Sequence, residues 1–80
     1  MRIHARKLRE RLGFSQDTVA HALGVAGSTI HRFETGERDL SSGLLEDLAD
    51  FYSKELHITV DIRELNRAAT AEEAQELGLR

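Results

Sequence analysis

Four polar side chains within one short stretch have the types and spacing to form hydrogen bonds with a ligand laid along a helix face. These side chains are Ser28, Thr29, His31 and Arg32. A guanidinium carries five N–H donors in a planar fork, and a hydroxyl both donates and accepts. Ile30 and Phe33 are interleaved with the polar positions and predict that the opposite face of the helix is buried. These four residues therefore favour recognition of a ligand through hydrogen bonds rather than a chemical reaction.

The rest of the sequence does not arrange reactive residues for catalysis or metal binding. The serines, histidines and aspartates form no recognisable nucleophilic triad, and the four histidines lack the spacing of metal ligands. The chain has no cysteine, which excludes disulfide frameworks and thiolate metal sites. We therefore expect a protein that is not an enzyme and that binds no cofactor or metal.

A pair of short helices is predicted to position the polar face. The first helix covers residues 15–23, where the Ser15 hydroxyl can accept from free N–H groups of the first turn. Its apolar stripe consists of Val19, Ala20 and Leu23. Gly24 follows at once and permits the positive φ angle that commonly ends a helix. The second helix covers residues 27–33 and carries the polar face.

The remaining sequence predicts further helices. We expect them over residues 2–12, from Ser41 or Ser42 to about 55, over 61–68, and from the capping box Thr70-Ala71-Glu72-Glu73 to near Gly78. Residues 56–62 alternate between apolar and polar types, which is typical of a strand. We favour a short extended link around 57–60. The fold is thus predicted to be all-α, a compact bundle of five to six helices with a short extended segment near 57–62.

Four alternating apolar residues in this segment have two interpretations. They are Leu56, Ile58, Val60 and Ile62. Either they pack against the core of their own chain, or they form a seam between two copies as an exchanged or paired strand. Both interpretations fit the pattern.

Charge is distributed unevenly along the chain. The net charge is −3, but residues 1–38 hold seven basic and four acidic residues, whereas residues 39–80 hold four basic and ten acidic ones. A polyanion would bind the basic half, and the acidic half would face away from it. No stretch approaches the roughly 20 apolar residues of a membrane span, and the basic N-terminus lacks the apolar run of a signal peptide. We expect a cytoplasmic protein with no membrane contact.

The joint spacing of these signals resembles the Cro and phage-repressor (XRE-type) helix-turn-helix family over about residues 5–52. The matching residues are Leu8-Arg9, Gly13-Phe14-Ser15-Gln16, Val19-Ala20, Leu23-Gly24-Val25, Ser28-Thr29-Ile30, Glu34, Gly36 and Ala49. The resemblance implies a sequence-specific regulator that binds double-stranded DNA, usually as a homodimer, through a helix-turn-helix at 15–34. We expect a DNA-binding domain over 1–55 and a C-terminal extension over 56–80 that serves dimerisation or a partner.

The resemblance also implies a role for each polar position of the recognition helix. Gly27, Ser28 and Arg32 occupy positions at which the family reads base edges. Thr29 occupies a position at which a hydroxyl often meets phosphates, and His31 could do either. Arginine reaching guanine O6 and N7 is the commonest specific contact, so Arg32 is the best candidate for direct readout.

Residues outside the recognition helix match supporting positions of the family. Ser15 and Gln16 begin the preceding helix, where Gln16 would contact a phosphate or brace a recognition side chain. Arg38, in the loop after the recognition helix, would meet the DNA backbone. Arg9 and Glu34 match a family pair that ties the first helix to the end of the third.

The sequence departs from the family pattern at three positions. Ala26 replaces the usual hydroxyl cap of the recognition helix, at a cost of about 1 kcal/mol. Gly27 has no side chain with which to read a base, so readout is either driven by DNA shape or limited to the other polar residues of the helix. Leu40 stands where the family often has proline.

Two functions follow from this resemblance. The first is a repressor that occludes a promoter as a two-fold dimer, with half-sites roughly 34 Å apart. The second is an antitoxin-type module, in which the acidic residues 53–80 bind a toxin or another protein partner.

Overall fold

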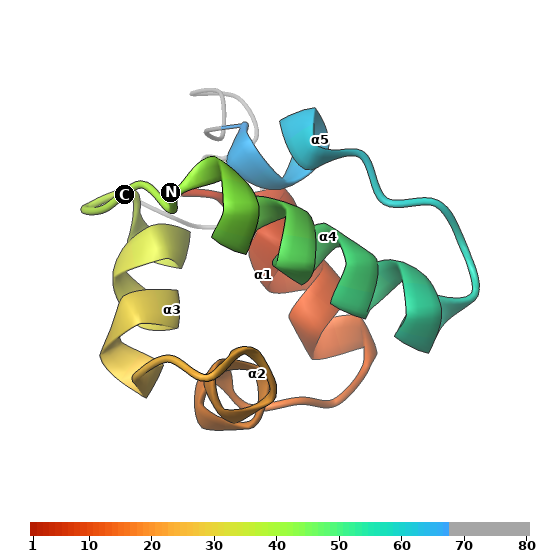
Figure 1. The fold of residues 1–80 in the computed structure, drawn as a ribbon, viewed down its shortest axis with the longest axis horizontal. Helices are drawn as coiled ribbons and strands as arrows, with labels where there is room; N and C mark the ends of the chain where they lie inside the picture. The colour runs from red at the N-terminus through yellow and green to blue at the C-terminus, as the bar shows by residue number, and fades with distance from the viewer. Residues whose placement is uncertain (68–80) are drawn as a thin grey trace.

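The computed structural model describes residues 1–67, which form five helices and no strand. The helices are α1 (Ile3–Arg11), α2 (Gln16–Leu23), α3 (Gly27–Thr35), α4 (Ser42–Leu56) and α5 (Ile62–Asn66) (Figure 1). The all-α prediction is confirmed. The helix predicted from Thr70 lies outside the described residues. None of the helices within residues 1–67 is long and apolar enough to cross a membrane.

Side-chain caps begin three of the helices, where local sequence signals predict them. The capping bonds run from Thr18 N to Ser15 Oγ (3.1 Å), from Leu44 N to Ser41 Oγ (3.3 Å) and from Arg63 N to Asp61 Oδ1 (2.8 Å). Ser41, rather than Ser42, is therefore the cap of α4. Each bond satisfies one N–H group that the helix itself leaves without a partner.

Glycines in the left-handed region end α2 and α3. Gly24 has a φ angle of 72° and Gly36 one of 89°. The predicted end of α3 at residue 33 is two residues short, because the left-handed Gly36 stops the helix only after Thr35.

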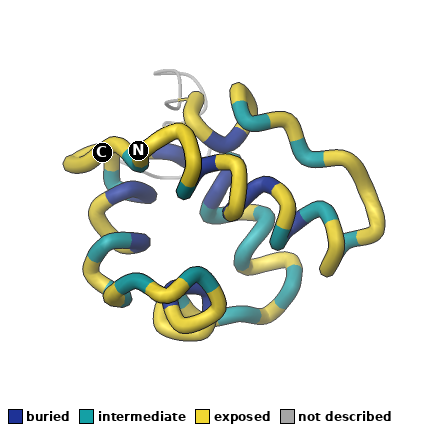
Figure 2. Tube along the Cα trace, in the orientation of Figure 1, coloured by how far each residue is buried: buried dark blue, intermediate teal, exposed yellow. Residues whose placement is uncertain are grey.

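The core lies where the inner faces of all five helices meet, and Figure 2 shows it as the dark-blue segments turned toward the centre of the molecule. Its largest fully buried side chains are Tyr52, Phe33, Ile30, Leu48, Leu65 and Val19. Leu65 belongs to α5, which packs against α1 and α4. Burial of these apolar groups is the main force that holds such short helices together.

Residues 57–61, called the link from here on, connect α4 to α5 without forming a strand. His57 adopts the left-handed conformation that ends α4. The Ser53 hydroxyl then donates to Ala49 O (2.7 Å) and accepts from Val60 N (2.9 Å), which fixes the link to the last turns of α4. A side chain thus satisfies the backbone that a strand partner would otherwise have bonded.

The four alternating apolar residues divide between the two interpretations. Val60 and Ile62 pack against the core and Leu56 is half-buried, as expected for burial within one chain. Ile58 differs, because 46% of its surface remains exposed. Ile58 is the residue of the four that stays available to a second molecule.

Candidate nucleic-acid interface

The turn between α2 and α3 is built by two backbone hydrogen bonds. Val25 N donates to Ala20 O (2.9 Å), and Gly24 N donates to His21 O (3.2 Å). This is the Schellman pattern, and it requires the left-handed conformation that Gly24 supplies. Ala20 is buried below the turn, and its small side chain lets α2 and α3 pack closely. The turn fixes the direction in which α3 leaves α2.

α3 has one buried face and one exposed face, which Figure 2 shows as dark-blue and yellow segments of the same helix. Ile30 and Phe33 are buried in the core. Ser28, His31 and Arg32 are exposed. Thr29 is half-buried, and it also carries a first-turn N–H that donates to Ala26 O (3.0 Å). The structure therefore brings the polar residues singled out from the sequence onto one surface.

The Arg32 guanidinium forms no ion pair or hydrogen bond within residues 1–67. In particular, no ion pair joins it to Glu37 among these residues. Its backbone carbonyl accepts from Thr35 Oγ1 (3.0 Å) and from Arg38 N (3.2 Å), so the main chain at this position is fixed. A fixed backbone with an uncommitted guanidinium suits recognition of an external acceptor.

The N-terminus of α3 lies against α2. Ala26 provides no side-chain cap, as its type predicts. A Cβ placed on Gly27 would overlap the carboxylate of Asp17, so the glycine at this position leaves room for the Asp17 side chain against the first turn of α3. The sequence marks Gly27 as a weak reader of bases, but it gives no sign that Asp17 lies beside it.

Glu34, a buried residue near the C-terminus of α3, is held by an arginine of α1. Arg9 Nε and Nη2 donate to the two carboxylate oxygens of Glu34 at 2.7 and 2.9 Å, and Arg9 Nη1 donates to Phe14 O at 2.9 Å. The hydrogen bond with Glu34 raises the pKa of Arg9. The predicted pair is present, and it ties α1 to α3.

Gln16 connects this pair to the exposed face of α3. Gln16 Nε2 donates to Glu34 Oε1 (3.2 Å) and lies 3.3 Å from His31 Nδ1. Ser15, the preceding residue, is occupied as the cap of α2 and lies at the surface. In this free state of the protein, Gln16 therefore braces an exposed side chain of α3.

Arg2 is a residue whose role is not evident from the sequence. It is buried, and its Nη1 donates to Phe33 O (2.7 Å) and Arg38 O (3.1 Å). Its Nη2 pairs with Asp39, and its Nε donates to Asn66 Oδ1 (3.3 Å). The guanidinium carbon also lies 4.5 Å from the ring centroid of Phe33. One side chain thus fixes the C-terminus of α3, the following loop and α5.

These positions correct the expectation that the basic N-terminal half gathers on one DNA-facing side. Arg2 is buried in the protein. Lys7 and Arg11 line a groove beside the link, and the link and α3 lie on opposite sides of the view in Figure 1. The cations carried by α3 and its following loop are Arg32 and Arg38, both exposed.

Comparison with protein families identifies the family of this domain. Residues 1–53 match the family model of a helix-turn-helix domain. Searches of curated proteins and of solved structures find no match. The matched residues cover more than half of the chain and include α1 to α3 and most of α4. The chain therefore belongs to the helix-turn-helix family, with a domain of the type found in XRE-like DNA-binding regulators.

Proposed function

We propose that the protein is a sequence-specific transcriptional repressor that acts in the cytoplasm as a homodimer, with α3 in the major groove of double-stranded DNA. The observation that carries this proposal is the two-faced character of α3. Ile30 and Phe33 fix the helix to the core, while Ser28, His31 and Arg32 project from it. An exposed polar helix on a rigid body is what major-groove docking requires.

Each polar residue has a proposed role that follows from its position. Arg32 reads a guanine, because its guanidinium forms no hydrogen bond or ion pair within residues 1–67 and its backbone is fixed by two hydrogen bonds. Ser28 and Gly27 lie in the first turn of α3. Ser28 contacts a base edge, and Gly27 lets the protein backbone approach the DNA closely. His31, held near Gln16, contacts a base or a phosphate.

The remaining proposed contacts position the protein on the DNA backbone. Thr29 and Gln16 meet phosphates, as does the exposed Arg38 of the loop after α3. The first turn of α2, capped by Ser15, presents N–H groups of a helix N-terminus to the same strand. Residues from 56 onward, which follow this unit, contribute to contacts between copies or with another protein.

Selection from a random pool of DNA duplexes with the purified full chain tests the proposal. We expect enrichment of one half-site, and the Arg32→Ala variant should lose discrimination at one base pair of that half-site, by about 1–3 kcal/mol. Arg63→Ala is the matched control, because Arg63 is a highly exposed arginine on α5. Absence of enrichment even at low salt would contradict sequence-specific DNA binding. An unchanged preference in the Arg32 variant would contradict base readout by Arg32.

A further inference from the structure

The first turn of α3 contains one position without a side chain. Gly27 begins the helix, and the preceding Ala26 provides no side-chain cap. A Cβ built on Gly27 would overlap Oδ1 of Asp17 and would lie 3.1 Å from its Cγ. The carboxylate of Asp17, which belongs to α2, therefore occupies the space that a side chain at position 27 would fill.

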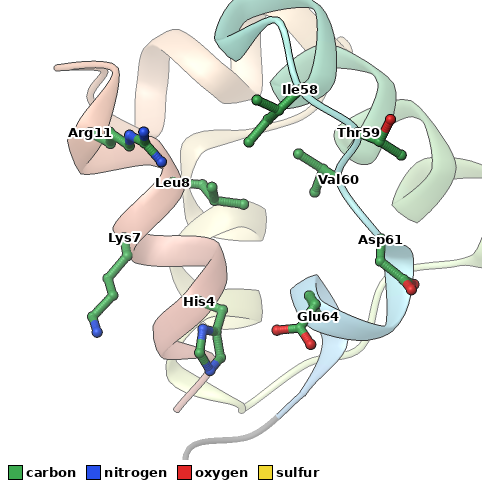
Figure 3. Close-up of a pocket in the computed structure, with 9 residues that line it drawn as sticks. All are labelled: His4, Lys7, Leu8, Arg11, Ile58, Thr59, Val60, Asp61 and Glu64. Carbon is green, nitrogen blue, oxygen red and sulfur yellow. The ribbon is translucent and has the colours of Figure 1, made fainter.

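The Asp17 carboxylate is available to an external donor. Asp17 lies in the first turn of α2 and is exposed. Within residues 1–67 its carboxylate forms no ion pair and no hydrogen bond. Two cations of α1, Lys7 and Arg11, line the groove beside the link instead (Figure 3). Asp17 thus presents two acceptor oxygens that pair with no cation among the described residues.

The position of this carboxylate along α3 differs from that of Arg32. Gly27 and Arg32 are five residues apart on the same helix, which corresponds to about 7.5 Å along its axis. Successive bases of one DNA strand are about 3.4 Å apart along the duplex. With α3 in the major groove, a group beside Gly27 therefore faces a base pair about two steps from the one that Arg32 faces.

We propose that Asp17 is a specificity-determining residue that reads the amino group of a cytosine beside the first turn of α3. It supplies from α2 the base contact that Gly27 cannot make. An ionised carboxylate only accepts hydrogen bonds, and the N4 amino group of cytosine is a donor in the major groove. This proposal rests on the proposed function, in which α3 binds DNA.

The other bases are disfavoured by their own groups in the major groove. Guanine presents the acceptors N7 and O6, and thymine presents the acceptor O4 and a methyl group. Adenine presents the N6 donor, but its N7 acceptor would face the second carboxylate oxygen. A carboxylate that loses its water without gaining a donor costs free energy. We therefore expect cytosine to be preferred first and adenine second.

Binding of the purified full chain to its selected duplex, with all four base pairs placed at each position in turn, tests the proposal. We expect the native protein to prefer cytosine by at least about fivefold, about two steps from the guanine read by Arg32. Asp17→Ala should bind all four base pairs at that position about equally and keep the preference at the Arg32 position, which also shows that the variant is folded. Asp17→Asn should shift the preference toward adenine, because an amide bonds to both N6 and N7. Asp47→Asn, at an exposed aspartate of α4, is the matched control and should leave the base profile unchanged.

A second variant moves the carboxylate without removing its charge. In Gly27→Ala the added methyl group takes the space in which the Asp17 carboxylate lies, so that this side chain must turn away. The cytosine preference should then be lost as in Asp17→Ala, although the net charge is unchanged. Alanine is a better helix former than glycine, so thermal unfolding should show no loss of stability.

The outcomes separate this inference from the function on which it rests. A native protein that selects no DNA sequence contradicts the proposed function and overturns the inference with it. A native protein that selects a site, with the same base profile in Asp17→Ala and Asp17→Asn, overturns the assignment of Asp17 alone. A cytosine preference that survives in Gly27→Ala overturns the role given to the space beside Gly27.

Discussion

The carboxylate of Glu34 on α3 receives two parallel hydrogen bonds from the guanidinium of Arg9 on α1. The side chains are 3% and 12% exposed, so the pair is largely shielded from water. Bidentate geometry fixes the relative orientation of the two groups as well as their distance. Because Glu34 lies at the C-terminal end of the proposed recognition helix, the pair sets the angle at which that helix leaves the bundle.

Replacing Glu34 by glutamine should lower the free energy of unfolding by about 3 kcal/mol, because it leaves the Arg9 charge buried without a counter-charge. Chemical denaturation measures the change. Glu37→Gln, an exposed carboxylate in the next loop, is the control. Arg9→Met combined with Glu34→Gln should cost less than the sum of the single changes. Additive costs would show that the two residues stabilise the fold independently.

Replacing Arg2 by lysine should destabilise the protein by about 2 kcal/mol, although the charge is retained. An ammonium group cannot reproduce the planar fork that bonds to Phe33 O and Arg38 O, and a buried carbonyl left without a donor is costly. Thermal unfolding of Arg2→Lys beside Arg63→Lys, a change at an exposed arginine, measures the difference. Equal stability of the two variants would contradict a role for the fork.

Alkaline pH should destabilise the fold through Tyr52. Burial of its ring, followed by the nearby charge of Glu34, raises the pKa of Tyr52 well above the ordinary value of 10.0. The folded state therefore favours the neutral phenol, and this contribution is complete below pH 10 and is lost as pH rises toward the folded-state pKa. Denaturant midpoints from about pH 8 to about pH 11 should fall more steeply for the native protein than for Tyr52→Phe.

Tyrosinate absorbance provides an independent check of the same prediction. Tyr52 is the single tyrosine of the chain, so the signal reports this residue alone. Ionisation should coincide with unfolding in the native protein, and it should occur near its ordinary pKa in denaturant. Ionisation near that ordinary value in the folded protein would contradict burial of the phenol.

The salt dependence of DNA affinity should be shallow for a DNA-binding protein. The logarithm of affinity falls by about 0.9 per logarithmic unit of salt for each phosphate neutralised. In the loop after α3, Arg38 is the exposed cation that we propose meets a phosphate, whereas Arg32 is proposed to read a base. We expect a slope of about one per protomer from Arg38. Arg38→Ala should reduce it by about 0.9 per protomer, whereas Arg63→Ala should not. A much steeper slope would place additional cations at the DNA.

The helix-turn-helix could be predicted from sequence because its signals are local. A hydroxyl at Ser15 and a glycine at Gly24 each determine the backbone within a few residues of themselves, and the structure has both the cap and the turn. The division of α3 into buried and exposed residues follows in the same way from helical periodicity. The Arg9 and Glu34 pair is nonlocal, and it was predicted only through resemblance to the family.

Other features depend on contacts that no local pattern encodes. The partners of Arg2 lie 31 to 64 residues away along the chain. The sequence around Arg2 therefore does not distinguish it from an arginine exposed to solvent. The alternation through Ile58 and Val60 is the same for a strand and for an extended link. The deciding contact is the Ser53 hydroxyl, which bonds to Val60 N in place of a neighbouring strand. Residues of this kind are assigned only when the tertiary structure is known.

The hydrogen bond from Arg2 to Asn66 has a consequence for the order of events during synthesis. Arg2 is synthesised well before its partners at Phe33, Arg38 and Asn66. On the ribosome, Arg2 must therefore wait until residue 66 has left the exit tunnel before all of its hydrogen bonds can form. Until then the end of the recognition helix lacks its full support. Completion of the proposed recognition surface is thereby coupled to release of the last described helix.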